Sequence, residues 1–399
     1  MTRPAAGAGL FLLTALTTSW GGASDAAVTA AAASSGTIHL TVTNPVDASR
    51  QAETVEVRAA VLAPRLSPRD LAGLCVTDLA GGHELLAQAV DENGDGTDDV
   101  LVFQADFAPR QARRFALTRC TPRPPRREDF RVYGRFVRER HDDFAWENDR
   151  VAFRVYGPAL ETFAGEPLTS SAVDVWSKRT RRLVIDDWYL VDDYHHDHGE
   201  GGDFYPAGRS RGCGGSGLIV DGALAVSRNF RDSRVLARGP IRLVFELTYP
   251  LWQDGLEAAE TKLVSLDAGS HFNRFESRYR LPPSRPADWA AGVRKAEGAQ
   301  LRIEKTRGFV RTWERQDRYG DGGWLGCAVV VDQARLADVV ERDGNVLAVG
   351  GLAASGPAVW YAGAGWDRSG DVPDVEAWDR EVEAFARRLA SPLKIEVEP

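Results

Sequence analysis

The residues best suited to chemistry gather in one polar, glycine-rich stretch, residues 188–217. The chain has 7 His, and His195, His196 and His198 lie almost side by side in this stretch. Imidazole titrates near neutral pH and is also a common metal ligand, so the cluster predicts either proton transfer or metal binding. The other side chains of the stretch that could contact a substrate are Trp188, Glu200, Asp203, Tyr205, Arg209 and Arg211.

A metal site would combine nitrogen and oxygen ligands. His196 and His198 share one face of an extended backbone, and Glu200 or Asp203 could add an oxygen. Such a set suits zinc, manganese or iron. Because two histidines separated by one residue are common, we keep a transition metal as the alternative and predict chemistry that requires no cofactor.

Metal-free acid/base chemistry on a sugar is the preferred interpretation. β-Elimination from a uronic-acid chain needs a base for the C5 proton, an acid for the leaving oxygen and a cation for the carboxylate. His196 or His198 could be the base, and Tyr205 could be the acid. The cation could come from one of three arginines: Arg209, Arg211 and Arg278.

Other roles stay open at this point. Hydrolysis or mutarotase-like epimerisation would use the same kinds of group, with Glu200 and Asp203 as paired carboxylates. In a non-catalytic carbohydrate-binding module, Trp188 and other members of the 11 Trp would stack on sugar rings, and His195 and Asp203 would hydrogen-bond to them. An enzyme should lose turnover but keep binding when His198 is replaced, whereas a binding module should lose affinity when an aromatic residue is removed.

A charged strand is predicted at residues 271–281. Alternation places Arg274, Glu276 and Arg278 on one face and Phe275 on the other. This face is either exposed to solvent or the floor of a cleft for a polar ligand, in which Glu276 and Arg278 would bind the substrate.

A possible weak calcium site lies in residues 91–99. Asp91, Asn93 and Asp95 alternate as oxygen ligands do in a calcium loop. Val102 occupies the position where an EF-hand places its bidentate Glu, so a hairpin turn rich in Asx residues, with no metal, is an equal alternative.

These groups must be positioned mostly by strands. Alternating apolar residues predict strands between residues 37 and 121, at 241–249, at 256–266 and at 301–310. One helix is predicted at 374–390, where Trp378, Val382, Phe385 and Leu389 recur at helical spacing.

The chain is expected to be exported and divided into two β domains. Residues 1–33 combine Arg3, a short apolar run and small residues, which is typical of a signal peptide. A small β-sandwich-like domain is predicted at 34–120, a Pro/Arg linker at 121–127 and a large domain at 128–399. In an oxidising compartment Cys75 and Cys120 could pair. The net charge of -8 argues against a nucleic-acid partner, and no later segment is apolar enough to span a membrane.

The large domain resembles a secreted bacterial family described as domain of unknown function 4861, which occurs beside polysaccharide-degrading enzymes. The motif from Asp197 to Asp203 fits the family's Asp-x-Gly-Glu-Gly-x-Asp core. The other matching stretches are residues 146–158, 271–274, 361–366 and 385–393. The resemblance implies a sugar-related setting and a large β-sandwich like that of galactose mutarotases and several polysaccharide lyases.

We therefore predict a mainly β protein, with a small N-terminal β domain, a large β-sandwich domain and a C-terminal helix. Its expected location is the periplasm or the extracellular space. The predicted function is lyase-type processing of an acidic carbohydrate, with Gly199, Gly201 and Gly202 allowing close approach of the ligand.

Overall fold

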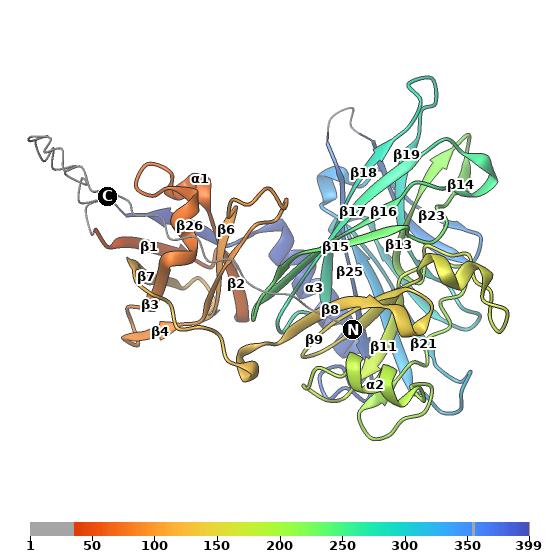
Figure 1. Ribbon diagram of the computed structural model, residues 1–399, viewed down its shortest axis with the longest axis horizontal. Helices are drawn as coiled ribbons and strands as arrows, with labels where there is room; N and C mark the ends of the chain where they lie inside the picture. The colour runs from red at the N-terminus through yellow and green to blue at the C-terminus, as the bar shows by residue number, and fades with distance from the viewer. Residues whose placement is uncertain (1–35, 353–355, 399) are drawn as a thin grey trace, which may run out of the picture. The chain divides into compact units, whose positions relative to one another are not determined.

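The computed structural model describes residues 36–352 and 356–398, and β-strands dominate this part of the chain (Figure 1). The predicted signal peptide at residues 1–33 lies outside the described residues. The chain from Thr37 onward forms one compact unit. No helix in the described part is long and apolar enough to cross a membrane.

The N-terminal strands form two sheets that pack face to face. The first sheet contains β26 (Lys394–Val397), β1 (Ile38–Thr43), β7 (Ala112–Arg119), β3 (Leu74–Asp78) and β4 (His83–Leu85). The second contains β2 (Arg50–Arg58), β6 (Val100–Phe107) and β5 (Ala87–Val90), and β2 leads into the short helix α1 (Ala59–Leu62). The predicted alternation holds, because Leu40, Val42, Val55, Val57 and Phe103 are buried between the two sheets.

One strand of the N-terminal sheet comes from the far end of the chain. Strand β26 pairs antiparallel with β1, with Leu40 opposite Val397. A disulfide joins Cys75 in β3 to Cys120, which directly precedes the linker. This is the pairing that we expected for an oxidising compartment. The predicted boundary between two domains at residues 121–127 stays a prediction. The pairing of β26 with β1 adds residues 394–397 to the N-terminal sheet.

The larger part of the chain is a sandwich of three sheets. The eight-stranded sheet contains β15 (Asp232–Arg238), β16 (Arg242–Tyr249), β17 (Ala259–Asp267), β18 (Phe272–Arg280), β25 (Ala358–Trp366), β22 (Trp324–Val330), β21 (Phe309–Arg315) and β20 (Gln300–Glu304). One five-stranded sheet contains β14 (Ala223–Ala225), β13 (Cys213–Val220), β19 (Asp288–Arg294), β24 (Asn345–Gly351) and β23 (Asp338–Arg342). The other contains β12 (Gly201–Gly202), β11 (Asp174–Lys178), β10 (Ala152–Val155), β9 (Asp143–Asn148) and β8 (Val132–Val137).

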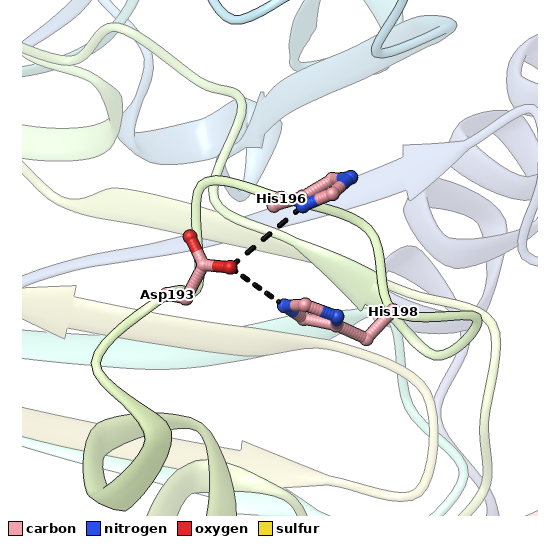
Figure 2. Close-up of side chains that lie close together, drawn as sticks. All are labelled: Asp193, His196 and His198. Carbon is pink, nitrogen blue, oxygen red and sulfur yellow. Dashed lines mark hydrogen bonds and ion pairs between the residues drawn. The ribbon is translucent and has the colours of Figure 1, made fainter.

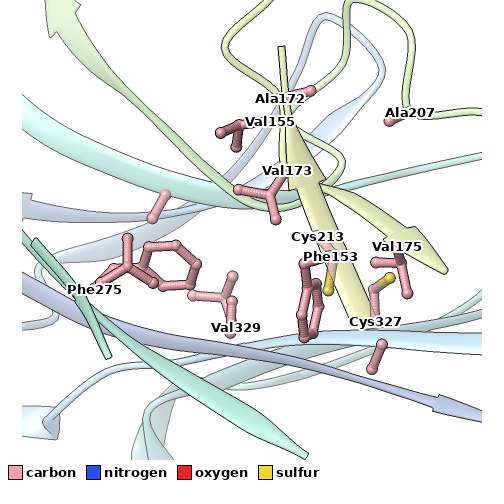
Figure 3. Packing of buried hydrophobic residues seen from close by; sticks show 14 of the residues in the cluster. Phe153, Val155, Ala172, Val173, Val175, Ala207, Cys213, Phe275, Cys327 and Val329 are labelled. Atoms are coloured by element: carbon pink, nitrogen blue, oxygen red, sulfur yellow. The ribbon is translucent and has the colours of Figure 1, made fainter. Parts of the chain in front are cut away.

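A single large core joins these three sheets. Figure 3 shows part of it, where Phe153 and Val175 of one sheet, Cys213 of the second, and Phe275 and Cys327 of the eight-stranded sheet gather. Both of these cysteines are free thiols buried in that core. The mainly β fold with a large sandwich is therefore confirmed.

Helix α3 (Val375–Ala390) is the predicted C-terminal helix. The side chain of Asp374 accepts a hydrogen bond from the Ala377 N–H, which is the predicted N-cap. Trp378 and Val382 pack on the eight-stranded sheet against Phe272 and Phe309. The helix therefore covers the face of the sheet that lies away from the large core.

One predicted strand is two strands. Residues 301–310 form the end of β20, a turn and the start of β21, because Gly308 has φ +72° and reverses the chain. Apolar residues lie on both sides of the turn, so the alternation of apolar and polar residues did not indicate where one strand ends and the next begins.

Candidate functional site

The histidine loop starts where helix α2 (Ile185–Val191) ends. Asp192 closes this helix in a left-handed conformation, and the chain then turns back until Gly201 and Gly202 pair with Lys178 and Ser177 of β11. A Cβ on Gly201 would lie 1.9 Å from the Ser177 carbonyl oxygen. Gly201 and Gly202 thus allow the loop to approach a strand, whereas we had expected them to admit a ligand.

Asp197 braces the tip of the loop. Its Oδ1 accepts hydrogen bonds from the N–H groups of Gly199 (2.8 Å) and Gly201 (3.0 Å), and its Oδ2 forms an ion pair with Arg179. His196 and His198 therefore project from an ordered turn.

His196 and His198 converge on Asp193 at the surface (Figure 2). Asp193 Oδ2 lies 2.9 Å from His198 Nε2 and 3.7 Å from His196 Nδ1. All three side chains are more than half exposed. The carboxylate beside the two histidines is therefore that of Asp193, whereas the sequence analysis had considered Glu200 or Asp203 for the oxygen ligand of a metal site.

The three residues offer donor atoms of the types that zinc takes, within 4.8 Å of one another. Among the described residues, no fourth His, Cys, Asp or Glu joins the group. The ring nitrogens of His196 and His198 that face away from Asp193 also lack the hydrogen bonds from described residues that orient ligating imidazoles in metal centres. The Asp193–His198 hydrogen bond accounts for the arrangement without an ion.

His195 occupies a different environment from its two neighbours. Its ring stacks on Tyr319, with the ring centroids 4.2 Å apart, and its side chain is 36% exposed. Nδ1 lies 2.9 Å from the main-chain oxygen of Asp203. Because a carbonyl oxygen only accepts hydrogen bonds, Nδ1 carries the proton, and in the neutral ring Nε2 has the free lone pair.

A buried network of charges lies directly behind His195. Arg154 donates to Asp174 Oδ2 (2.8 Å) and to Asp203 Oδ2 (2.7 Å), and its Nη1 lies 3.6 Å from Asp143 Oδ2. Tyr156 also donates to Asp174 (2.9 Å). Three carboxyl groups thus surround one guanidinium group, with all four side chains almost completely buried.

This surplus of buried carboxyl groups alters their protonation. Burial, with Asp174 nearby and Arg154 only partly compensating, raises the pKa of Asp143 to about 7. Burial and the neighbouring Asp174 likewise raise the pKa of Asp203 well above its usual range. Burial lowers the pKa of His195, and the positive charge of Arg154 adds to this effect. His195 is therefore predominantly neutral at neutral pH.

Three further polar side chains lie in this region: Tyr319, which stacks on His195, and Arg140 and Glu166, which connect to His195 through Tyr194. Arg140 lies 3.3 Å from Glu166 and forms a hydrogen bond with the hydroxyl of Tyr194, whose ring packs against His195. Tyr319 is exposed. This small surface offers a neutral imidazole, a phenol hydroxyl, a carboxylate and a guanidinium group.

Several predicted residues lie elsewhere. Tyr205 is buried in the large core, and Arg211 is buried and donates to Ser171 and to the Ser216 carbonyl, so neither can contact a substrate in this conformation. Glu200 forms an ion pair with Arg182. Arg209 is exposed.

The predicted aromatic platform is mostly core. Trp188 stacks on Trp176, with centroids 5.4 Å apart, and Trp360 and Trp366 are fully buried.

The charged face of β18 does not meet the histidine loop. Phe275 on the opposite face packs in the large core, where Gly214 of strand β13 approaches it. Glu276 instead pairs on its own face with Arg274 (2.8 Å) and Arg278 (2.7 Å). Glu276 is buried between these two arginines, whereas Arg278 is exposed, and substrate binding at this face stays a prediction.

The loop at residues 91–99 has the hydrogen bonds of an Asx-rich turn. Asp91 accepts from the N–H groups of Gly94 (2.6 Å) and Gly96 (2.8 Å), and Asn93 accepts from the N–H of Asp95 (2.8 Å). These contacts are the ones that the turn without a metal predicts, and the calcium site stays a prediction.

The sequence analysis missed Asp143, Arg154 and Asp174. Each comes from a different strand, and each lies among apolar neighbours that resemble ordinary strand residues. The one available indication was the charged residue inside each apolar run, because charges are rarely buried unless they are paired.

Comparisons with known proteins agree with the resemblance. A curated relative, "Uncharacterized protein P7" of Formosa agariphila, is 32% identical over 374 residues, which are 90% of this chain and 93% of that protein. Among solved structures, a protein in the glycosyl hydrolase family 38 from Enterococcus faecalis superposes with a TM-score of 0.50 and 10% identity over 91% of this chain. The chain spans about half the length of that structure, 47%, so the likeness shows a shared fold alone. The family model named domain of unknown function (DUF4861) matches residues 42–395, and the chain therefore belongs to this family.

Proposed function

We propose that the protein is an exported, carbohydrate-active enzyme that cleaves an acidic, uronic-acid-containing sugar chain by β-elimination. The observation that carries the proposal is His195, a half-exposed imidazole whose Nδ1 donates to the Asp203 carbonyl and whose Nε2 is available as a base. A general base needs this combination of a defined tautomer, access to the substrate and a neutral state at working pH.

Three side chains supply the parts of the reaction. His195 Nε2 removes the C5 proton of the uronic acid, and the C4–C5 double bond forms as the C4–O bond breaks. The Tyr319 hydroxyl, in place of the buried Tyr205, protonates the leaving oxygen. Arg140 neutralises the carboxylate of the substrate and so stabilises the anion that develops at C5.

The buried network positions the base. Arg154 holds Asp203 (2.7 Å), and the main-chain oxygen of Asp203 holds His195. The positive charge of Arg154 also disfavours the protonated form of His195. The imidazole therefore stays neutral before the reaction and can act as the base.

Two further observations support the setting. The solved structure with the same fold is titled as a glycosyl hydrolase family protein. The Cys75–Cys120 disulfide suits an exported protein, because disulfides persist in oxidising compartments.

The test is an assay of the purified protein on a panel of uronic-acid polysaccharides, following the ultraviolet absorbance of the new C4–C5 double bond. We expect His195→Gln to lower kcat by about 10²–10⁴-fold while substrate still binds, because general-base catalysis contributes that much. The matched controls, His196→Gln and His198→Gln, should retain activity and its pH profile. The midpoint of the activity loss at acidic pH should lie below the usual histidine pKa of about 6.5.

Other outcomes would assign the site differently. Activity that needs His196, His198 and an added divalent metal, and that a chelator removes, would establish the metal alternative. A panel that yields neither absorbance nor new reducing ends would rule out a depolymerase.

A further inference from the structure

We propose that a second site, an arginine-lined pocket beside helix α2, binds a negatively charged stretch of an oligosaccharide. The pocket is open, with a volume of about 840 Å³, which falls in the roughly 300–1,000 Å³ range of small-molecule sites. Its basic side chains are Arg127, Arg131, Arg181, Arg182 and Arg238. None of these residues belongs to the site around His195.

Each acidic residue of the pocket has a basic partner. Glu147 pairs with Lys178 (2.5 Å), and Asp186 pairs with Arg135 (2.5 Å). The remaining two pairs are Asp187 with Arg182 (2.7 Å) and Glu128 with Arg126 (3.7 Å).

Two of the arginines remain without such a partner. Within the described residues, Arg127 and Arg238 form no ion pair with a carboxylate, and both are exposed. Arg131 has only Asp149 at 4.0 Å. The pocket therefore presents uncompensated positive charge on a chain whose net charge is -8.

The shape and the aromatic content favour a sugar as the carrier of the negative charge. Tyr133 and Phe130 also line the pocket, and the Arg238 guanidinium lies 5.8 Å from the centre of the Tyr133 ring. Aromatic faces stack on sugar rings, and guanidinium forks bind carboxylate or sulfate in a bidentate manner. A pocket of this size holds a few sugar units and lacks the extended basic face that nucleic acids need.

Helix α2 and strand β9 connect the pocket to His195. The N–H groups of Val184 and Ile185 donate to Glu147 in the pocket wall, and the Tyr189 hydroxyl donates to Asp143 in the network behind His195. Asp143 and Glu147 point to the same side of β9, and at about 3.3 Å per residue they lie roughly 13 Å apart. A role of the pocket in catalysis rests on the proposed function, whereas binding itself does not.

The experiment is calorimetric titration of the full chain with three probes of similar length: an oligogalacturonate, a sulfated neutral galactan oligomer and an uncharged oligosaccharide. We expect the carboxylated or the sulfated probe to bind, and whichever binds identifies the charge that is recognised. The double variant Arg127→Gln/Arg238→Gln should weaken that binding about tenfold or more, since it removes two guanidinium groups that form charge-assisted hydrogen bonds with the ligand.

Arg65→Gln, at an exposed arginine outside the pocket, is the matched control and should bind as the wild type does. Thermal melting of each variant shows whether it is folded. The single variant Arg127→Gln gives a second measurement, because the Arg127 side chain forms no hydrogen bond or ion pair with other described residues. Unchanged affinity in both variants, equal binding of the uncharged probe, or no binding of either charged probe would overturn the proposal.

The two proposals fail in different ways. If His195→Gln keeps turnover while the double arginine variant loses affinity, the proposed base is wrong and the pocket stands. If turnover depends on His195 but the arginine variants bind normally, the pocket proposal alone falls.

Discussion

Three histidines that are neighbours in sequence have different physical roles. His195 points to the buried network and has a defined tautomer, whereas His196 and His198 lie at the surface with Asp193. The difference arises from the turn at residues 192–198, which directs adjacent side chains to opposite sides of the loop. Residue type alone made the three equivalent. The sequence therefore predicted His196 or His198 as the base, whereas the proposed function places the base at His195.

His271 allows a test at the same scale. Burial disfavours its charged form, but Asp371 (3.7 Å) and Glu381 (3.8 Å) outweigh burial and raise the pKa of His271 above its usual value, against the opposing charge of Arg150. We expect His271→Gln to lower the free energy of unfolding by about 1–3 kcal/mol near pH 6, because a charged hydrogen-bonded group is lost.

The pH dependence of this loss follows from the direction of the shift. Stability from a group whose folded pKa is raised is complete below the unfolded pKa, about 6.5, and disappears as pH rises through the folded pKa. The difference between the wild type and His271→Gln should therefore shrink above pH 6.5 in urea titrations. A difference that grows with pH would contradict this account, and the exposed His83→Gln serves as the control.

At the scale of elements, the short strand β12 decides where the loop lies. Gly201 has φ +118° and contacts β11 so closely that no side chain fits, whereas Gly199 has φ +100° with open space around it. The contact places Asp203 beside Arg154 and therefore sets the position of His195.

Gly201→Ala should consequently destabilise the protein by more than Gly199→Ala does. Both variants strain the backbone at positive φ, which costs about 1 kcal/mol. Only Gly201→Ala also forces the loop away from Ser177, so we expect a further loss of about 1–3 kcal/mol and lower activity. Equal unfolding free energies from denaturant titration would show that the loop does not depend on this contact.

At the scale of the whole molecule, the first and last strands of the described chain pair in one sheet. Strand β26 completes the N-terminal sheet after α3 has packed on the eight-stranded sheet. The Cys75–Cys120 disulfide adds a covalent link within the same region. The N-terminal sheets therefore depend on residues from both ends of the chain.

Removing the disulfide tests this dependence. The bond encloses 45 residues, and the loss of loop-closure entropy predicts that Cys75→Ser/Cys120→Ser lowers the free energy of unfolding by about 4 kcal/mol or less. Titration of denatured wild type should find two free thiols before reduction and four after it. Four free thiols in protein purified from the exported fraction would contradict both the disulfide and its use as support for export.

The sequence by itself determined the elements whose signals are local. The alternation of Leu40 and Val42 predicted a strand because a half-buried strand must alternate, and the spacing of Trp378 and Val382 predicted α3 for the corresponding reason. The family motif around Glu200 indicated the family to which the chain belongs. These features depend on the nearest neighbours along the chain, which a sequence displays directly.

The tertiary structure alone decided which groups meet. Asp143, Arg154, Asp174 and Asp203 are brought together by pairing of β9, β10 and β11 and by the return of the loop. Burial then raises the carboxyl pKa values and orients His195. Contacts and desolvation of this kind depend on residues far apart in the chain, so the sequence could point to the loop but could not show that His195 and its two neighbours have different environments.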